Sequence, residues 1–100
     1  MEMKSKRDGD KLTLWLQGDV CADCVPATEA FLKENLAGVK NLTVDFGGVG
    51  KFANEGLMLL LSTKKKLGDA DLTMVNVSEE LYDRLEEQGV TTLMNVVKAV

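Results

Sequence analysis

The feature that most constrains the fold is the segment from Leu42 to Leu57, which reads LTVDFGGVGKFANEGL. A short apolar strand pattern, Asn41–Asp45, leads into the glycine-rich stretch FGGVGKF, which we expect to form a loop. Asn54 is a favourable N-cap residue, and Glu55 suits the positive end of a following helix. The segment therefore predicts a strand, a loop and a helix in direct succession.

The residues before this segment predict a β-hairpin and a helix. Asp8-Gly9 is a strong two-residue turn signal within the first 17 residues. After this turn leucines occupy every second position, until Gly18-Asp19 ends the strand pattern. Pro26 suits the first turn of a helix, and Gly38 is a reasonable stop for it.

The residues after Asn54 predict two helices and two strands. The first helix would bury one leucine face, formed by Leu57, Leu60, Leu61 and Leu67. Residues 72–77, LTMVNV, predict an apolar strand, and Ser78 would cap a further helix that Gly89 closes. The core side of that helix would hold Leu81, Tyr82 and Leu85. Residues 92–97 predict a last strand, and strands that alternate with helices imply a partly parallel sheet.

Composition excludes several classes of function. The chain has 100 residues, of which 45% are hydrophobic and 28% charged, so we expect one soluble domain over residues 1–100. A net charge of −4 without a basic stripe argues against nucleic-acid binding. No apolar run approaches the ~18 residues of a membrane span and no signal peptide is recognisable, so we expect no membrane insertion and a cytoplasmic location.

Nothing in the sequence predicts catalysis. The chain has no histidine, which removes the commonest general base and the commonest metal ligand. The glycines at 47, 48 and 50 lack the lysine and the spacing of a phosphate-binding loop. We therefore expect a protein that is not an enzyme and that carries neither a cofactor nor a metal.

The same segment resembles the signature of STAS domains, the family of sulfate transporter and anti-sigma factor antagonist domains. The positions in step with the family pattern are Asp45, Gly48, Val49, Phe52, Gly56 and Leu57. The resemblance implies an α/β fold, with a mixed β-sheet of about five strands and three or four α-helices mainly on one side. It also implies a bacterial regulator that binds a protein, an anti-sigma factor of the serine-kinase type, and that exists as a monomer or weak dimer.

The chain departs from the family at the site of phosphorylation. The usual Asp-Ser-Ser triplet has become Ala53-Asn54-Glu55, and Asn54 stands where the phosphorylated serine would be. Glu55 either imitates part of the charge of a phosphate or, with Asn54, only caps the helix, which is the simpler interpretation. The resemblance places the partner surface at residues 52–59 and 18–24. Its candidate residues are Asp19, Cys21, Phe52, Asn54, Glu55, Gly56, Met58 and Leu59.

Two of these residues, Met58 and Leu59, fall outside the leucine face of the predicted helix. Methionine in the first turn of an exposed helix suits an adaptable binding surface. The alternative is that a neighbouring loop covers both side chains.

Cys21 and Cys24 form a Cys-x-x-Cys pair ahead of a helix. Aligned on Gly18 and Pro26, Cys21 replaces an acidic residue of the family pattern. The pair could be packing residues, a redox pair, or half of a metal site, and packing is the simplest of the three. If the pair is functional, we expect the first thiol to be the acidic one, because a helix start stabilises a thiolate.

Two other classes of function remain open from the sequence. The chain could be a non-switching STAS subunit of a transport or scaffold assembly. It could also be a thiol or metal sensor that uses Cys21 and Cys24.

Overall fold

The computed structural model describes residues 2–99 of the chain. The strands are β1 (Glu2–Asp8), β2 (Lys11–Val20), β3 (Asn41–Phe52), β4 (Asp71–Val77) and β5 (Asn95–Lys98). The α-helices are α1 (Val25–Asn35), α2 (Asn54–Leu67) and α3 (Glu79–Glu87). Two short 3-10 turns, η1 (Ala22–Cys24) and η2 (Val90–Thr92), precede α1 and β5.

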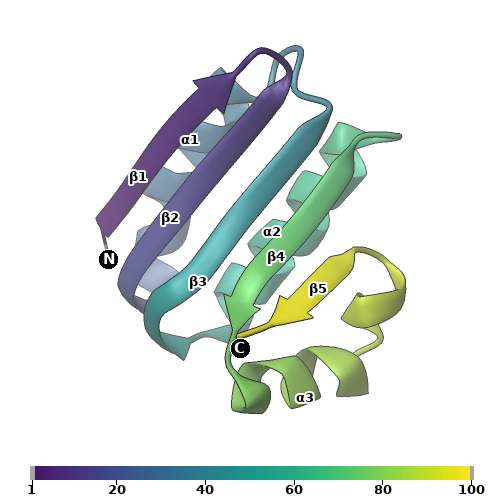
Figure 1. Cartoon of the computed structure of the whole chain (residues 1–100). Helices are drawn as coiled ribbons and strands as arrows, with labels where there is room; N and C mark the ends of the chain where they lie inside the picture. Colours follow the sequence, from purple (N-terminus) through teal and green to yellow (C-terminus); the bar gives the residue numbers. More distant parts are fainter. Residues whose placement is uncertain (1, 100) are drawn as a thin grey trace.

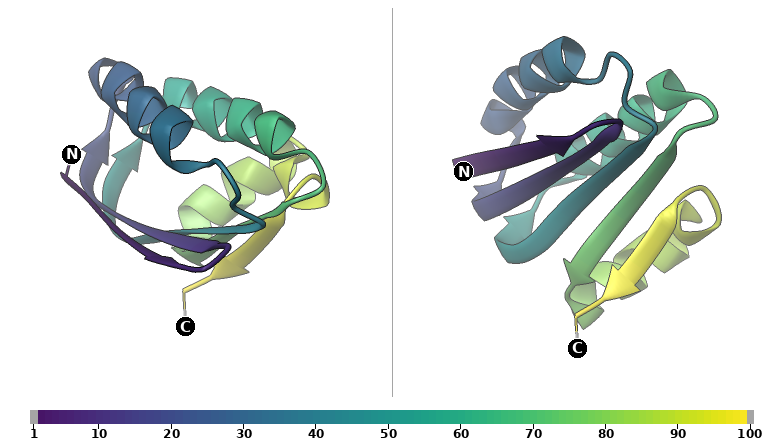
Figure 2. Two further views of the ribbon diagram at one scale, coloured as in Figure 1. Left: turned by 90° about the horizontal axis from the view of Figure 1, so that it is seen from above. Right: turned by 45° about the horizontal axis from the view of Figure 1, so that its top comes forward.

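The strands form one five-stranded mixed sheet in the order β1-β2-β3-β4-β5. β1 and β2 are an antiparallel hairpin, and every later pair is parallel. The helices α1 and α2 lie behind the sheet in Figure 1, and the view from above in Figure 2 places α3 on the same side. The predicted fold class, a mixed sheet with helices mainly on one side, is therefore confirmed.

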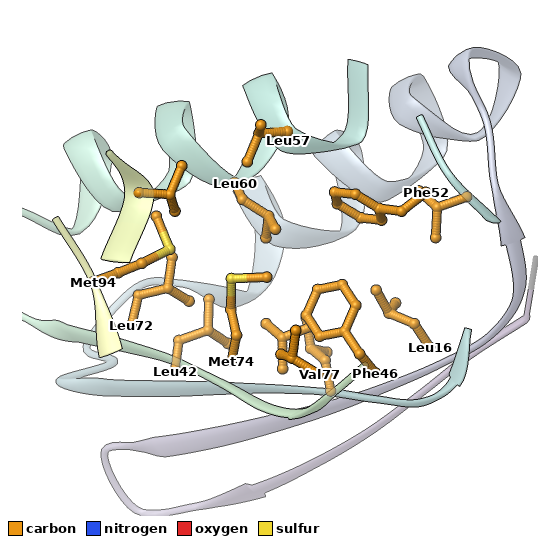
Figure 3. Close-up of a cluster of buried hydrophobic side chains, with 14 of the residues drawn as sticks. Leu16, Leu42, Phe46, Phe52, Leu57, Leu60, Leu72, Met74, Val77 and Met94 are labelled. Carbon is orange, nitrogen blue, oxygen red and sulfur yellow. The ribbon is translucent and has the colours of Figure 1, made fainter. Parts of the chain in front are cut away.

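The core lies between the sheet and these helices. Every second residue of β2 is buried there, namely Leu12, Leu14 and Leu16, because side chains alternate between the two faces of a strand. Figure 3 shows Leu57 and Leu60 of α2 pointing towards the sheet. The sheet residues that point back at them include Leu42, Leu72 and Met74. The apolar periodicity of the sequence thus predicts which faces are buried.

The hairpin is present, with small shifts from the prediction. The turn residues are Gly9 and Asp10, one position later than predicted, because Asp8 still pairs with Lys11. Gly9 has a φ of +62°, which suits a glycine in a tight hairpin turn. β2 also continues to Val20, past the predicted stop at Gly18-Asp19.

The glycine-rich stretch FGGVGKF belongs to β3, and the prediction of a loop there is wrong. β3 continues to Phe52 and pairs with the end of β2 through two irregularities in register. A Cβ atom on Gly48 would lie 3.1 Å from the carbonyl oxygen of Leu16, so glycine here allows the two backbones to approach closely. Glycine and bulges therefore adapt this strand to its neighbour instead of ending it.

The helix after β3 begins one residue earlier than the predicted cap at Asn54 implies, so the prediction of Asn54 as the N-cap is wrong. Ala53, with extended φ and ψ angles, is the N-cap residue of α2, and Asn54 is already helical. Within α2, Leu57 and Leu60 are buried as predicted, whereas Leu61 and Leu67 are only partly buried against the core.

In the C-terminal third of the chain, the predicted helix cap is confirmed and the predicted position of the last strand is wrong. Ser78 caps α3 as predicted, and its hydroxyl oxygen accepts a hydrogen bond from the amide of Leu81. The predicted strand at 92–97 is displaced to Asn95–Lys98. The hydroxyl of Thr92 donates to the carbonyl of Gly89 at 2.7 Å, which holds the residues before β5 in the η2 turn.

Candidate functional site

Two segments that are distant in sequence meet at one end of the sheet. These are residues 18–24, which comprise the end of β2 and the η1 turn, and residues 50–55, which comprise the end of β3 and the start of α2. The amide of Ala53 donates to the carbonyl of Val20 at 2.8 Å. The amide of Lys51 donates to the Asp19 carboxylate at 2.9 Å. The structure therefore brings together the two halves of the surface that the sequence predicts, and we call residues 18–24 and 50–59 the junction surface.

The predicted site residues divide into an exposed and a buried set. The exposed set is Asp19, Cys21, Asn54, Glu55 and Met58. Leu59 is half-buried and packs against the core. Phe52 is only 8% exposed, and its ring meets that of Phe46 edge to face at 5.4 Å. Phe52 and Gly56 are therefore buried members of the junction surface and support its exposed residues.

Gly56 lets the first turn of α2 pack closely on its neighbours. A Cβ atom at this position would lie 3.0 Å from a methyl group of Val20 and 3.1 Å from the ring of Phe52. These are tighter than ordinary van der Waals contacts, so a larger residue would push the helix start away from the sheet. Gly56 thus fixes the position of the exposed residues on either side of it.

A groove of about 290 Å³ runs between α1 and α2 beside the helix start. Its lining residues are Val25, Glu29, Glu55, Met58, Leu59 and Ser62. Met58 is 68% exposed, which is unusual for a large apolar side chain, and it is not covered by a loop. The groove is therefore lined by apolar side chains together with one glutamate from each helix.

Arg84 of α3 also contacts the junction surface, although the sequence does not single it out. Its guanidinium donates one hydrogen bond to the carbonyl of Phe52 and another to the side-chain oxygen of Asn54. The side chain of Asn54 therefore accepts from an arginine instead of capping its own helix. Arg84 lies 30 residues from Asn54 in the chain, so no local pattern could reveal the contact.

Asp45 holds the middle of β3 to the end of β4. One carboxylate oxygen accepts from the amide of Gly47 at 2.8 Å, and the other accepts from the side-chain amide of Asn76 at 2.9 Å. Asn76 has a φ of 55°, a left-handed conformation that asparagine tolerates better than most residues. Asp45, a position in step with the family pattern, therefore has a structural role in joining β3 to β4.

The cysteine pair lies at the edge of the junction surface. The two sulfur atoms are 3.1 Å apart, and Cys21 is exposed while Cys24 is half-buried. Hydrogen bonds from Cys21, first from its backbone and then from its thiol, lower the pKa of Cys24 below the ordinary thiol value. The lowered pKa belongs to the second cysteine. From the sequence we expected ordinary thiols if the pair only packs, and an acidic first thiol if it is functional.

Two negative features of residues 2–99 bear on other kinds of site. In this range no three His, Cys, Asp or Glu side chains gather in an arrangement that could hold a metal ion. Over the same residues, no helix is both long enough and apolar enough to span a membrane.

Comparison with solved structures identifies the fold. An anti-sigma factor antagonist from Mycobacterium paratuberculosis matches with a TM-score of 0.85 and 17% identity, over 96% of this chain and 84% of that chain. A candidate anti-sigma factor antagonist from Thermotoga maritima matches with a TM-score of 0.87 and 10% identity, over 98% and 87%. The phosphorylated form of SpoIIAA from Bacillus matches with a TM-score of 0.77 and 15% identity, over 95% and 90%.

No protein-family model and no curated protein matches the sequence. The structural matches nevertheless cover nearly the whole chain, so this chain has the STAS fold of the anti-sigma factor antagonists. The predicted resemblance is confirmed at the level of the fold.

Proposed function

We propose that this chain is a non-enzymatic, protein-binding regulatory domain of the anti-sigma factor antagonist type, and that it binds through the junction surface. The fold it shares with such antagonists supports this proposal. The observation that carries it is the exposed Met58 at the start of α2, in a groove beside the phosphoserine-equivalent position. The partner would be an anti-sigma factor of the serine-kinase type.

The groove suggests what the partner must present. Glu29 and Glu55 line the groove together with apolar side chains, and the whole chain has a net charge of −4. A partner segment with an apolar side chain flanked by lysine or arginine would complement both features. Met58 would contribute most of the binding energy, since exposed apolar side chains at the centre of an interface commonly do so.

The domain would bind without the usual control by phosphorylation. SpoIIAA has been solved in a phosphorylated and an unphosphorylated form. In this chain Asn54 occupies the equivalent position, and residues 50–59 contain no hydroxyl group. A kinase therefore has no acceptor at the start of α2. Glu55 supplies a single negative charge, which is less than the ~ −1.5 to −2 of a phosphate.

The test is a calorimetric titration of this domain against each anti-sigma factor of the serine-kinase type in the native host. We expect Met58→Asp to weaken binding at least ~10-fold, about 1.4 kcal/mol, because it places a charge among the apolar side chains of the groove. Leu93→Asp is the matched control, because Leu93 is also exposed, at 57%, but lies outside the junction surface. Equal affinity of wild type and Met58→Asp, or no binding by the wild type, would refute the proposal.

A further inference from the structure

The geometry of the cysteine pair is that of a preformed dithiol. A 3-10 turn of residues 22–24 brings the two cysteines together, and the amide of Cys24 donates to the carbonyl of Cys21 at 3.0 Å. The sulfur atoms lie 3.1 Å apart, so one thiol can donate a hydrogen bond to the other. Little backbone rearrangement is needed for the two sulfur atoms to react with each other.

Packing does not account for this pair. Cys21 is exposed and Cys24 only half-buried, and neither belongs to the buried core. The residues that fill the core near this end of β2 are instead Val20 and Phe52. A cysteine that serves only to pack is normally among the most buried residues of a protein. Two sulfur atoms in contact outside the buried core call for a chemical explanation.

We propose that Cys21 and Cys24 are a thiol–disulfide exchange site, which small disulfides such as oxidised glutathione convert to an intramolecular disulfide. This inference goes beyond the proposed function, since it needs no protein partner. The proposed exchange site lies close in sequence to Asp19, whose carboxylate accepts a hydrogen bond from the amide of Lys51 in β3.

The exchange proceeds in two balanced steps. The Cys24 thiolate attacks one sulfur of the small disulfide, and the released thiolate takes up a proton to become a thiol. The Cys21 thiol then loses its proton to solvent and attacks the Cys24 sulfur, which releases the second small thiol. The two cysteines are oxidised to one disulfide, and the small disulfide is reduced to two thiols.

Cys24 is the better attacking group for electrostatic reasons. Hydrogen bonds from the backbone and then from the thiol of Cys21 lower the pKa of Cys24. Lost hydration and the Asp23 carboxylate act in the opposite direction, but less strongly. Cys24 is also the N-cap residue of the 11-residue helix α1, where the helix dipole favours an anion. A larger thiolate fraction at neutral pH speeds attack on a disulfide.

The test equilibrates the folded protein with mixtures of reduced and oxidised glutathione, traps thiols by alkylation and weighs the products by mass spectrometry. We expect the mass of the folded wild type to fall by two hydrogens and to include no glutathione adduct. This should occur at a ratio of reduced to oxidised glutathione at which the protein unfolded in urea still keeps its thiols. Cys21→Ser, which lacks the resolving thiol, should instead accumulate one glutathione adduct on Cys24. Circular dichroism checks that both proteins remain folded.

The pH dependence of alkylation provides an independent measurement. In wild type, iodoacetamide should label Cys24 at a lower pH than an ordinary free thiol, whose pKa is about 8.5. The proposal fails if the folded protein keeps both thiols at every glutathione ratio. It also fails if both cysteines carry glutathione without an internal disulfide, or if the disulfide forms no more readily in the folded chain than in urea.

Discussion

At the scale of single residues, the junction surface depends on contacts between residues that are far apart in the chain. Helical periodicity places Met58 outside the leucine face, but the sequence left open whether a loop covers it, and the structure shows it exposed. The role of Asn54 could not be predicted, because an asparagine before a helix usually caps it and here it accepts from Arg84. The lowered pKa of Cys24 was also unpredictable, since it depends on the fold of the η1 turn.

The residue-scale prediction concerns Arg84. Arg84→Ala removes both hydrogen bonds that hold the junction, to Phe52 and to Asn54. Because Arg84 is only half-buried, we expect a loss of about 1.5 kcal/mol, the lower end of the range for hydrogen bonds to charged groups. Urea melts measure this loss, and hydrogen exchange should show faster exchange of the amides at 53–57.

Two control variants separate the contributions. Asn54→Ala removes only one of the bonds and should cost less than Arg84→Ala. Arg84→Lys should also be less stable than wild type, because a lysine ammonium group lacks the planar guanidinium fork that donates to two acceptors at once. If Arg84→Ala is as stable as wild type and leaves amide exchange unchanged, the arginine does not hold the junction.

At the scale of elements, local patterns predict the helices well and the strand ends poorly. The cap of α3 at Ser78 and the buried leucines of α2 and α3 follow local patterns, so they can be predicted from neighbouring residues, whereas the predicted cap of α2 at Asn54 is wrong by one residue. The length of β3 depends instead on β2, whose backbone approaches Gly48 and whose Asp19 accepts from Lys51. The start of β5 likewise depends on its pairing with β4. Whether a glycine-rich stretch forms a loop or a strand thus cannot be predicted until its partner strand is known.

The element-scale prediction concerns the buried face of α2. Leu60 is 6% exposed and points into the core, so Leu60→Ala should destabilise the domain by ~2–5 kcal/mol. Leu61, its neighbour on the same helix, is only partly buried, so Leu61→Ala should cost clearly less. Urea unfolding curves with equal slopes give both values. Losses below about 1 kcal/mol for Leu60→Ala, or a larger loss for Leu61→Ala, would mean that the helix is rotated.

At the scale of the whole molecule, the sequence predicts the architecture and the position of the candidate site. The shape and the charge of the surface there come only from the structure. The partly parallel sheet follows from the order of strands and helices, and the placement of the helices mainly on one face is what the resemblance to STAS domains implies. The groove between α1 and α2 could not be predicted, because it needs the relative position of two helices that are 18 residues apart in the chain. Its glutamates add a charge pattern that only the assembled fold reveals.

The central claim is that this domain occupies an anti-sigma factor without being switched off by it, and the most direct test measures sigma factor release. The purified domain is added to a preformed complex of the native host's kinase-type anti-sigma factor with its sigma factor, either with ATP or with ADP. Because residues 50–59 carry no hydroxyl group, we predict that the released fraction is the same with both nucleotides and stays constant over time. Phosphopeptide mass spectrometry on the same samples should find no phosphate at the start of α2. Failure to release the sigma factor with either nucleotide would contradict the claim, and so would release that decays with ATP alone.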